Sequence, residues 1–176
     1  MPKSRTKFVC TVGLLISIGL ILHIVESLIP MSYIVPGAKI GLANIASLLG
    51  LVIFGFKIGF LILIFRIMLG SVLAGTFLSF NFFMSLSGGG LGFVMMGLAF
   101  YLASDHFSLI GISVLGALFH NIGQIMTAMF IISNFGLLYY LPYLALLALP
   151  AGIGIGLTVD FTRNYLSSGA VGGRAV

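Results

Sequence analysis

One arginine stands inside a long apolar run, where lipid offers it no partner. Arg66 follows Lys57 by nine residues, almost all apolar, and a rise of about 1.5 Å per residue places it near the midplane of a bilayer. Insertion scales assign a free-energy cost of about 2.5 to 3.5 kcal/mol to an arginine at that depth. Arg66 is therefore a candidate for a binding or transport site. The alternative is a structural arginine that holds backbone carbonyls or Glu26.

A second polar group lies in the run His120-Asn121-Ile122-Gly123-Gln124. His120 and Gln124 are four positions apart, so they share one face of a helix with their donors and acceptors one turn apart. A lone buried histidine is more often structural than functional. Three polar side chains in one turn must be satisfied by something, and contact with a ligand and a structural role are equally compatible with this pattern.

The remaining polar side chains lie near the ends of apolar segments, on the side that the charge pattern below places outside. We expect them to line one binding chamber that opens outward, since the opposite half of the apolar segments is almost free of polar groups. Lys39 and Arg66 outnumber Glu26, which favours an anionic or carboxylate-bearing ligand. The predicted substrate-binding residues are Lys39, Asn44, Arg66, His120, Asn121, Gln124, Glu26 and Asn81.

The composition shows which elements must position these residues. The chain has 60% hydrophobic and only 6% charged residues, whereas a soluble domain carries about 25% charged residues. It is therefore expected to be an all-α membrane protein, a single integral membrane domain over residues 1–176 formed by a six-transmembrane-helix bundle. The predicted spans are about 8–29, 41–55, 58–79, 86–103, 107–133 and 139–161, and the second is short enough that we expect it to tilt little or not to cross fully.

The basic residues predict the orientation of the bundle. An even number of spans puts both termini on one side, and the positive-inside rule makes that side the cytoplasm. The segment 8–29 is too long for a signal peptide and lacks a small-residue cleavage site, so we expect a retained first helix in a multi-pass protein of the prokaryotic plasma membrane. The cations that then lie inside are Lys3, Arg5, Lys7, Lys57, Arg163 and Arg174.

Several kinds of chemistry are not expected. The single cysteine, Cys10, excludes an internal disulfide, and no Cys or His pair has the spacing of a zinc site, so we expect no metal and no cofactor. The Gly88-Gly89-Gly90 run lacks the lysine and hydroxyl residue of a phosphate loop. The basic residues form no soluble patch with interleaved aromatics, which argues against nucleic acid.

Small residues in the first segment suggest a helix partner. Gly13 and Ser17 are four positions apart, with Gly19 as a neighbour, and such stripes let membrane helices approach closely. The partner is either another helix of this chain or another subunit.

Four stretches of the sequence resemble the Gx transporter family, which is also labelled heptaprenyl diphosphate synthase component I: residues 36–45, 54–57, 66–71 and 120–124. More distantly, the chain is similar to the S components of energy-coupling factor transporters. That resemblance implies six helices, cytoplasmic ends, an outward-facing pocket and a gating role for residues 36–39. It also implies a transmembrane coupling subunit and ATPases as partners, with Gly13 and Ser17 in place of the family's docking alanines.

Three functions compete at this stage. The leading one is a substrate-binding subunit that takes up a small, vitamin-like or anionic solute with an ATPase-driven partner. Prenyl diphosphate synthesis needs clustered aspartates for magnesium, but the only acids are Glu26, Asp105 and Asp160, far apart in sequence. We therefore expect no enzyme, and at most a non-catalytic partner of one. The third function is a membrane anchor in a quinone or flavin redox assembly.

Overall fold

A computed structural model describes residues 5–28, 41–102 and 107–168 of the chain. These residues form six α-helices and one 3-10 helix, and they contain no strand. The all-α prediction is confirmed for this part of the chain. The helices are α1 (Arg5–Leu28), α2 (Asn44–Phe54), α3 (Phe56–Leu73), α4 (Phe80–Leu102), α5 (Leu109–Ile132), the 3-10 helix η2 (Phe135–Tyr140) and α6 (Leu141–Ser168).

Five of the helices are long and apolar enough to cross a membrane, namely α1, α3, α4, α5 and α6. The exception is α2, whose 11 residues extend about 16 Å, or roughly half of the 30 Å hydrocarbon core. The predicted second span is thus short, as expected. The six predicted segments correspond to five helices of spanning length and one of about half that length.

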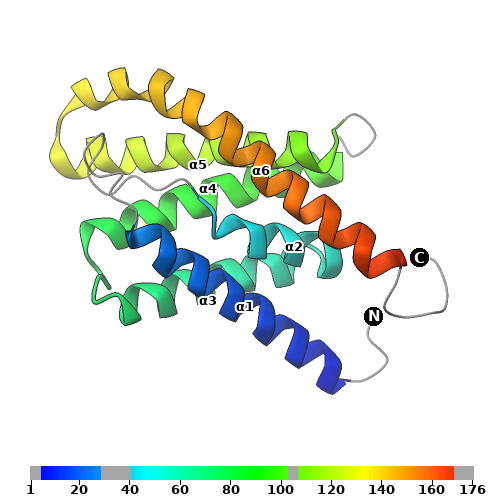
Figure 1. Cartoon of the computed structure of the whole chain (residues 1–176). Coiled ribbons are helices and arrows are strands. Elements are labelled where there is room, and N and C mark those ends of the chain that lie inside the picture. The colour runs from blue at the N-terminus through cyan, green and yellow to red at the C-terminus, as the bar shows by residue number, and fades with distance from the viewer. Residues whose placement is uncertain (1–4, 29–40, 103–106, 169–176) are drawn as a thin grey trace.

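The short helix lies in the middle of the bundle. α2 contacts α1, α3, α4 and α6, and most of its residues are buried. Its core partners include Ile62 and Ile67 on α3 and Phe93 on α4. Figure 1 shows α2 between the long helices, and it also shows that α1 starts and α6 ends at the same end of the bundle.

A one-residue turn joins α2 to α3. Gly55 adopts φ 87° and ψ 178°, a backbone conformation that side chains disfavour. The helices then pack backbone to backbone, because a Cβ added at Gly59 would lie 2.8 Å from the backbone nitrogen of Leu51. The hydroxyl of Tyr101, on α4, accepts the first N–H of α3, from Phe56, at 3.1 Å.

The turn between α3 and α4 corrects the predicted boundaries. The prediction extended the third span to residue 79 and began the fourth at residue 86, but α3 ends at Leu73 and α4 begins at Phe80. The reason is a helix-ending motif at Gly75, which has φ 66°. Its N–H reaches the carbonyl of Val72, and the N–H of Thr76 reaches the carbonyl of Ser71, a pairing that terminates a helix.

Glycines bring the last three long helices together. A Cβ at Gly92, on α4, would lie 2.7 Å from the carbonyl oxygen of Gly116 on α5. A Cβ at Gly152, on α6, would lie 2.6 Å from Cα of Val114, also on α5. At these positions glycine lets the helix backbones touch.

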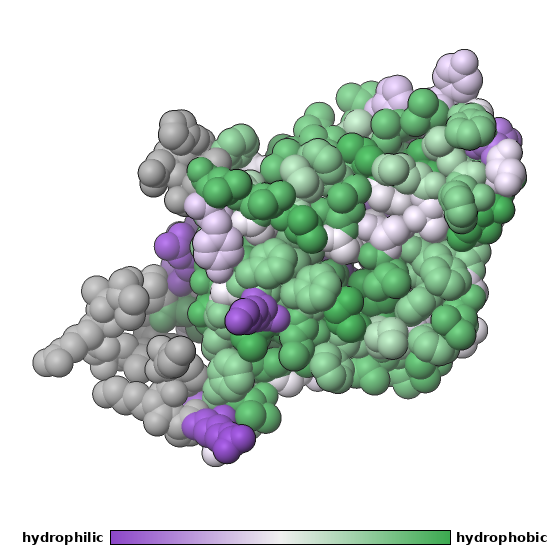
Figure 2. Space-filling view, turned by 180° about the vertical axis from the view of Figure 1, so that it is seen from behind, coloured by the Kyte–Doolittle hydropathy of each residue, from purple (hydrophilic) through white to green (hydrophobic). Residues whose placement is uncertain are grey.

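The surface fits a lipid environment. Figure 2 shows a face covered mostly by hydrophobic residues, with few strongly hydrophilic ones. The exposed cations among the described residues lie near the end where α1 starts: Arg5, Lys7, Lys57 and Arg163. Exposed Phe135 and Tyr139 lie at the opposite end, as aromatic residues do at a membrane interface.

Candidate functional site

The amino terminus of α2 lies inside the bundle. Asn44 is ten residues from Phe54 at the other end of the helix, so α2 begins about 15 Å from its turn with α3, near mid-depth of a bilayer. The first N–H groups of a helix have no partner within the helix, and they carry partial positive charge. Those of Asn44 and Ile45 reach the carbonyls of Gly41 and Leu42, so the N–H groups of this preceding turn are the ones that need an acceptor in the interior.

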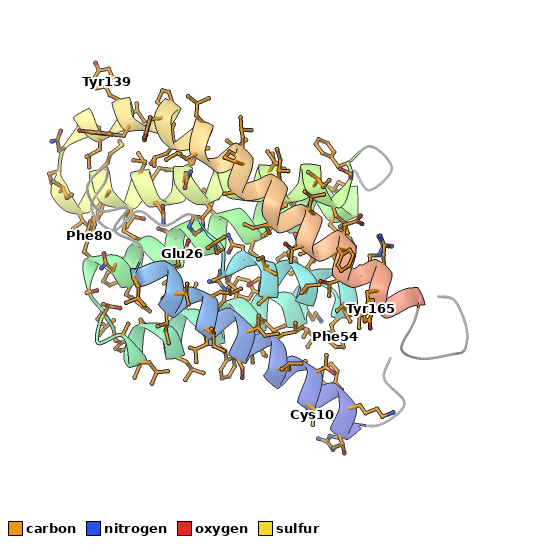
Figure 3. The ribbon with its side chains drawn as sticks, viewed as in Figure 1. Cys10, Glu26, Phe54, Phe80, Tyr139 and Tyr165 are labelled. Atoms are coloured by element: carbon orange, nitrogen blue, oxygen red, sulfur yellow. The ribbon has the colours of Figure 1, made fainter. Side chains whose placement is uncertain are left out.

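Glu26 provides that acceptor. Its Oε1 accepts hydrogen bonds from the N–H of Gly41 and, at 3.2 Å, from the N–H of Leu42, the residues just ahead of α2. The side chain is 4% exposed, and Figure 3 shows it where α1 ends, against the inner helices. The carboxylate thus joins the end of α1 to the beginning of α2. The sequence places Glu26 near this end of the first span, but gives no sign of its backbone partners.

Arg66 lies on the other side of the same helix terminus. Its Nη2 donates to Oδ1 of Asn44 at 2.5 Å, and its Nε donates to Oγ of Ser47 at 3.1 Å. Its charge is opposite to that of Glu26, and the two attract each other. Ser47 is absent from the predicted site. The signal that points to it is its position three residues after Asn44, on the same face of one helix.

His120 and Gln124 approach from α5. A Cβ added at Gly41 would lie 3.6 Å from Cδ2 of His120, and one added at Gly88 would lie 3.3 Å from Cε1 of the same ring. The Cγ of Gln124 lies 2.7 Å from that Gly88 position. A Cβ at the adjacent Gly89 would lie 3.7 Å from Nη2 of Arg66. The two α5 side chains and the guanidinium thus meet the same glycine pair of α4.

These contacts define one group of buried polar side chains drawn from α1, α2, α3 and α5. We call it the polar cluster. All of its members are at most 4% exposed. The polar cluster consists of Glu26, Asn44, Ser47, Arg66, His120 and Gln124.

Three predicted site residues are not part of the polar cluster. Asn121 is buried, but its Nδ2 donates to the carbonyl of Leu144 at 2.8 Å and so joins α5 to α6. Asn81 is exposed in the first turn of α4. Lys39 lies outside the described residues.

The small residues of α1 point in two directions. Gly13 and Ser17 are exposed, and a Cβ at Gly13 would meet no described atom within 4 Å. The hydroxyl of Ser17 donates to the carbonyl of Gly13 at 2.9 Å, so it presents little polarity outward. Gly19 faces inward, where its added Cβ would lie 3.0 Å from Cδ of Arg66. Gly13 and Ser17 thus form a smooth outer face, and Gly19 makes room for the arginine.

The acids of the described residues lie far apart. Glu26 belongs to the polar cluster, whereas Asp160 lies near the end of α6, where its Oδ2 accepts from Asn164 at 3.5 Å. No group of three His, Cys, Asp or Glu residues that could hold a metal ion occurs in the described part of the chain. The polar cluster supplies hydrogen-bond donors and acceptors with one charge of each sign, which suits it to hold a polar molecule.

A family model described as heptaprenyl diphosphate synthase component I matches residues 15–162. The chain belongs to this family. The match to the heptaprenyl diphosphate synthase component I family extends from the middle of α1 into the last third of α6 and includes the whole polar cluster. The word component in the description of the family implies a partner subunit. No curated protein and no solved structure matches the chain.

Proposed function

We propose that this chain is the membrane-embedded, solute-binding subunit of an uptake system, in the manner of an energy-coupling factor S component. The observation that carries the proposal is the polar cluster, in which helices distant in sequence bring buried charges and amides to one place. Ionisable groups inside membrane helices mark substrate or ion pathways by default.

Stability alone gives a weak reason to keep such a group. Replacing a buried ion pair by well-packed apolar residues is often neutral or stabilising by about 1 to 4 kcal/mol. The neighbouring core of α2 and α3 is aliphatic, with Leu48, Leu51 and Ile62 fully buried, so apolar substitutes would fit the surroundings. A functional requirement explains why Glu26 and Arg66 remain there.

The position of the polar cluster supports uptake from outside. Arg66 lies about 15 Å from the start of α3, and Glu26 lies two residues from the opposite end of α1. The exposed cations lie at the end where α1 and α3 start, and the positive-inside rule assigns that end to the cytoplasm. The polar cluster then extends from mid-membrane toward the side away from the cytoplasm.

The energy would come from partner subunits. We propose a transmembrane coupling subunit and ATPases, with the exposed face of Gly13 and Ser17 as the docking surface. The chain itself would bind and carry the solute without chemical conversion, and therefore would not be an enzyme.

The decisive experiment is purification of the tagged chain from native membranes, followed by identification of copurifying proteins and released small molecules by mass spectrometry. An ATPase or coupling subunit together with a bound solute is the expected result. A chain that carries neither would refute the proposal.

The family name favours a second function, a non-catalytic membrane partner of a prenyl diphosphate synthase. The same purification separates the two functions, because the second predicts a copurifying soluble prenyl transferase instead of an ATPase. A copurifying flavoprotein or quinone-dependent enzyme would instead indicate a redox anchor. Prenyl transfer by the purified chain alone would contradict its proposed lack of enzymatic activity.

A further inference from the structure

α1 and α3 meet through two glycines, each of which makes room for a side chain of the other helix. A Cβ added at Gly19, on α1, would lie 3.0 Å from Cδ of Arg66 on α3. A Cβ added at Gly70, on α3, would lie 2.6 Å from Cδ2 of His23 on α1. The glycine and the large side chain are four residues apart on each helix, so they share one face. The two contacts therefore follow each other one turn apart along a single seam.

This seam fixes how far along α3 the helix α1 lies. The imidazole of His23 is 2% exposed and rests where α3 carries no side chain. If α1 moved one turn toward the start of α3, the ring would come opposite Arg66, which is itself buried. Close-packed interiors leave no space for such an overlap. The fit of His23 onto Gly70 therefore sets the register of the two helices.

The position of Glu26 depends on this register. Glu26 follows His23 by three residues on α1, so the two side chains lie on the same face about one turn apart. The carboxylate accepts the N–H groups of Gly41 and Leu42 ahead of α2. A hydrogen bond is lost when donor and acceptor separate by more than a few tenths of an ångström beyond their normal range. A small displacement of α1 would thus detach Glu26 from the start of α2.

We propose that His23 is a positioning residue of the solute site, which acts by holding Glu26 against the start of α2. His23 is absent from the site residues expected from the sequence. Its part in a solute site rests on the proposed function, whereas its effect on Glu26 rests on the contact with Gly70 alone. A purely structural histidine would affect only the stability of the fold. A positioning histidine also changes the surroundings of Glu26 while the protein remains folded.

The reactivity of Glu26 toward dicyclohexylcarbodiimide tests this inference without a known solute. This apolar reagent reaches carboxyl groups inside membrane proteins and leaves a stable N-acylurea, which peptide mapping by mass spectrometry assigns to a residue. The full chain is labelled in native membranes as the unmodified protein, as His23→Ala and as Gly70→Ala. Asp160 in the same sample serves as the reference for reagent delivery. Size-exclusion chromatography after purification reports whether each variant is folded.

Gly59→Ala is the matched control on the same helix. Its added Cβ would lie 2.8 Å from the backbone nitrogen of Leu51, a contact as close as the one at Gly70. The two glycines are 11 residues apart, or about 16 Å along α3. Gly59→Ala therefore strains the packing of α3 without touching the seam that positions Glu26.

We expect Glu26 to react about tenfold faster in His23→Ala and Gly70→Ala, which corresponds to the loss of one hydrogen bond to a charged group. Gly59→Ala should leave the rate unchanged. Equal rates in the unmodified chain and both seam variants would overturn the inference and leave the proposed function standing. An equal increase in Gly59→Ala would also overturn it, because general loosening would then explain the effect. If Gly70→Ala does not fold, His23→Ala, which adds no atom, decides alone.

The link to the solute is tested separately, by mass spectrometry of the molecules that each purified variant releases on heating. His23→Ala and Gly70→Ala should release about tenfold less solute than the unmodified chain, in proportion to the weaker hold on Glu26. Full solute retention together with a more reactive Glu26 would show that His23 does not serve the solute site. If the unmodified chain releases no molecule, the proposed function fails, and the rate of Glu26 modification still decides whether His23 positions this carboxylate.

Discussion

Oδ1 of Asn44 accepts a hydrogen bond from Nη2 of Arg66 at 2.5 Å. The two residues stand at equal distances in sequence from Gly55, the single residue between α2 and α3. A one-residue turn between antiparallel helices fixes which residues lie opposite each other, and Gly50 and Gly59 are also neighbours across this hairpin. The turn at Gly55 therefore sets the geometry of the polar cluster about three helical turns farther on.

Glu26→Gln should destabilise the protein strongly. The change removes the negative charge that attracts Arg66 and weakens the acceptor for the N–H groups of Gly41 and Leu42. Removing one partner of a buried charge pair costs about 3 to 5 kcal/mol. Denaturant unfolding in detergent micelles measures this loss.

The control for this prediction is Asp160→Asn, which should change the free energy of unfolding by less than about 0.5 kcal/mol. The double variant Glu26→Gln with Arg66→Gln should recover part of the lost stability, because no uncompensated charge remains. Equal stability of Glu26→Gln and the unmodified chain would contradict a charge pair in the interior.

Gly41→Ala tests the turn that leads into α2. Gly41 has φ 90°, and an added Cβ would lie 3.0 Å from Nδ2 of Asn44. We expect a loss of about 2 to 4 kcal/mol in unfolding free energy, from backbone strain and crowding together. Gly75→Ala is the matched control, since φ is 66° there but no described atom lies within 4 Å. It should lose only about 1 to 2 kcal/mol, from strain alone, and equal losses would contradict the crowding.

Gly152→Ala tests close packing between α5 and α6. The added Cβ would lie 2.6 Å from Cα of Val114, so the helices must separate, at a cost of about 1 to 3 kcal/mol. Gly154→Ala, two residues along the same helix, meets no described atom within 4 Å and should be neutral or stabilising by up to about 1 kcal/mol. Thermal unfolding of both variants in detergent measures the difference. A similar melting temperature for the two would show that the helices do not touch at Gly152.

The sequence indicated the helical class and the shortness of α2 because both depend on local apolar length. It also predicted that Asn44, Arg66, His120 and Gln124 lie in one place, because polar side chains without partners in lipid must gather. It did not indicate the partners of Glu26. Its carboxylate binds backbone N–H groups of residues 41 and 42, and these carry no side-chain signature.

Two differences from the prediction had a signal in the sequence. Asn121 is one residue from His120 and therefore about 100° away around the helix, so the two side chains point in different directions. This angle points Asn121 to α6, where it binds Leu144. The early end of α3 could be read from Gly75, because glycine commonly follows the last turn of a helix. The prediction followed apolar length past that signal.

The orientation of the bundle remains a prediction that labelling can check. In a Cys10→Ser background, Tyr139→Cys and Lys57→Cys place one thiol at each end, and both positions are exposed. The positive-inside rule predicts that a membrane-impermeant maleimide labels Tyr139→Cys in intact cells and Lys57→Cys only after permeabilisation. The reverse labelling pattern would show that the bundle has the opposite orientation in the membrane, with the polar cluster nearer the cytoplasm.

Gly13→Leu tests docking on the exposed face of α1. The new side chain meets no described atom within 4 Å of its Cβ, so the melting temperature of the isolated chain should not fall. A partner helix that packs against Gly13 would be pushed away, and we expect at least about a tenfold loss of copurified subunit, or 1.4 kcal/mol of binding free energy. Gly90→Leu, on α4, is the control, because an added Cβ there also meets no described atom within 4 Å. Quantitative mass spectrometry of the copurified proteins compares the two, and an equal yield would show that the partner binds another face of the bundle.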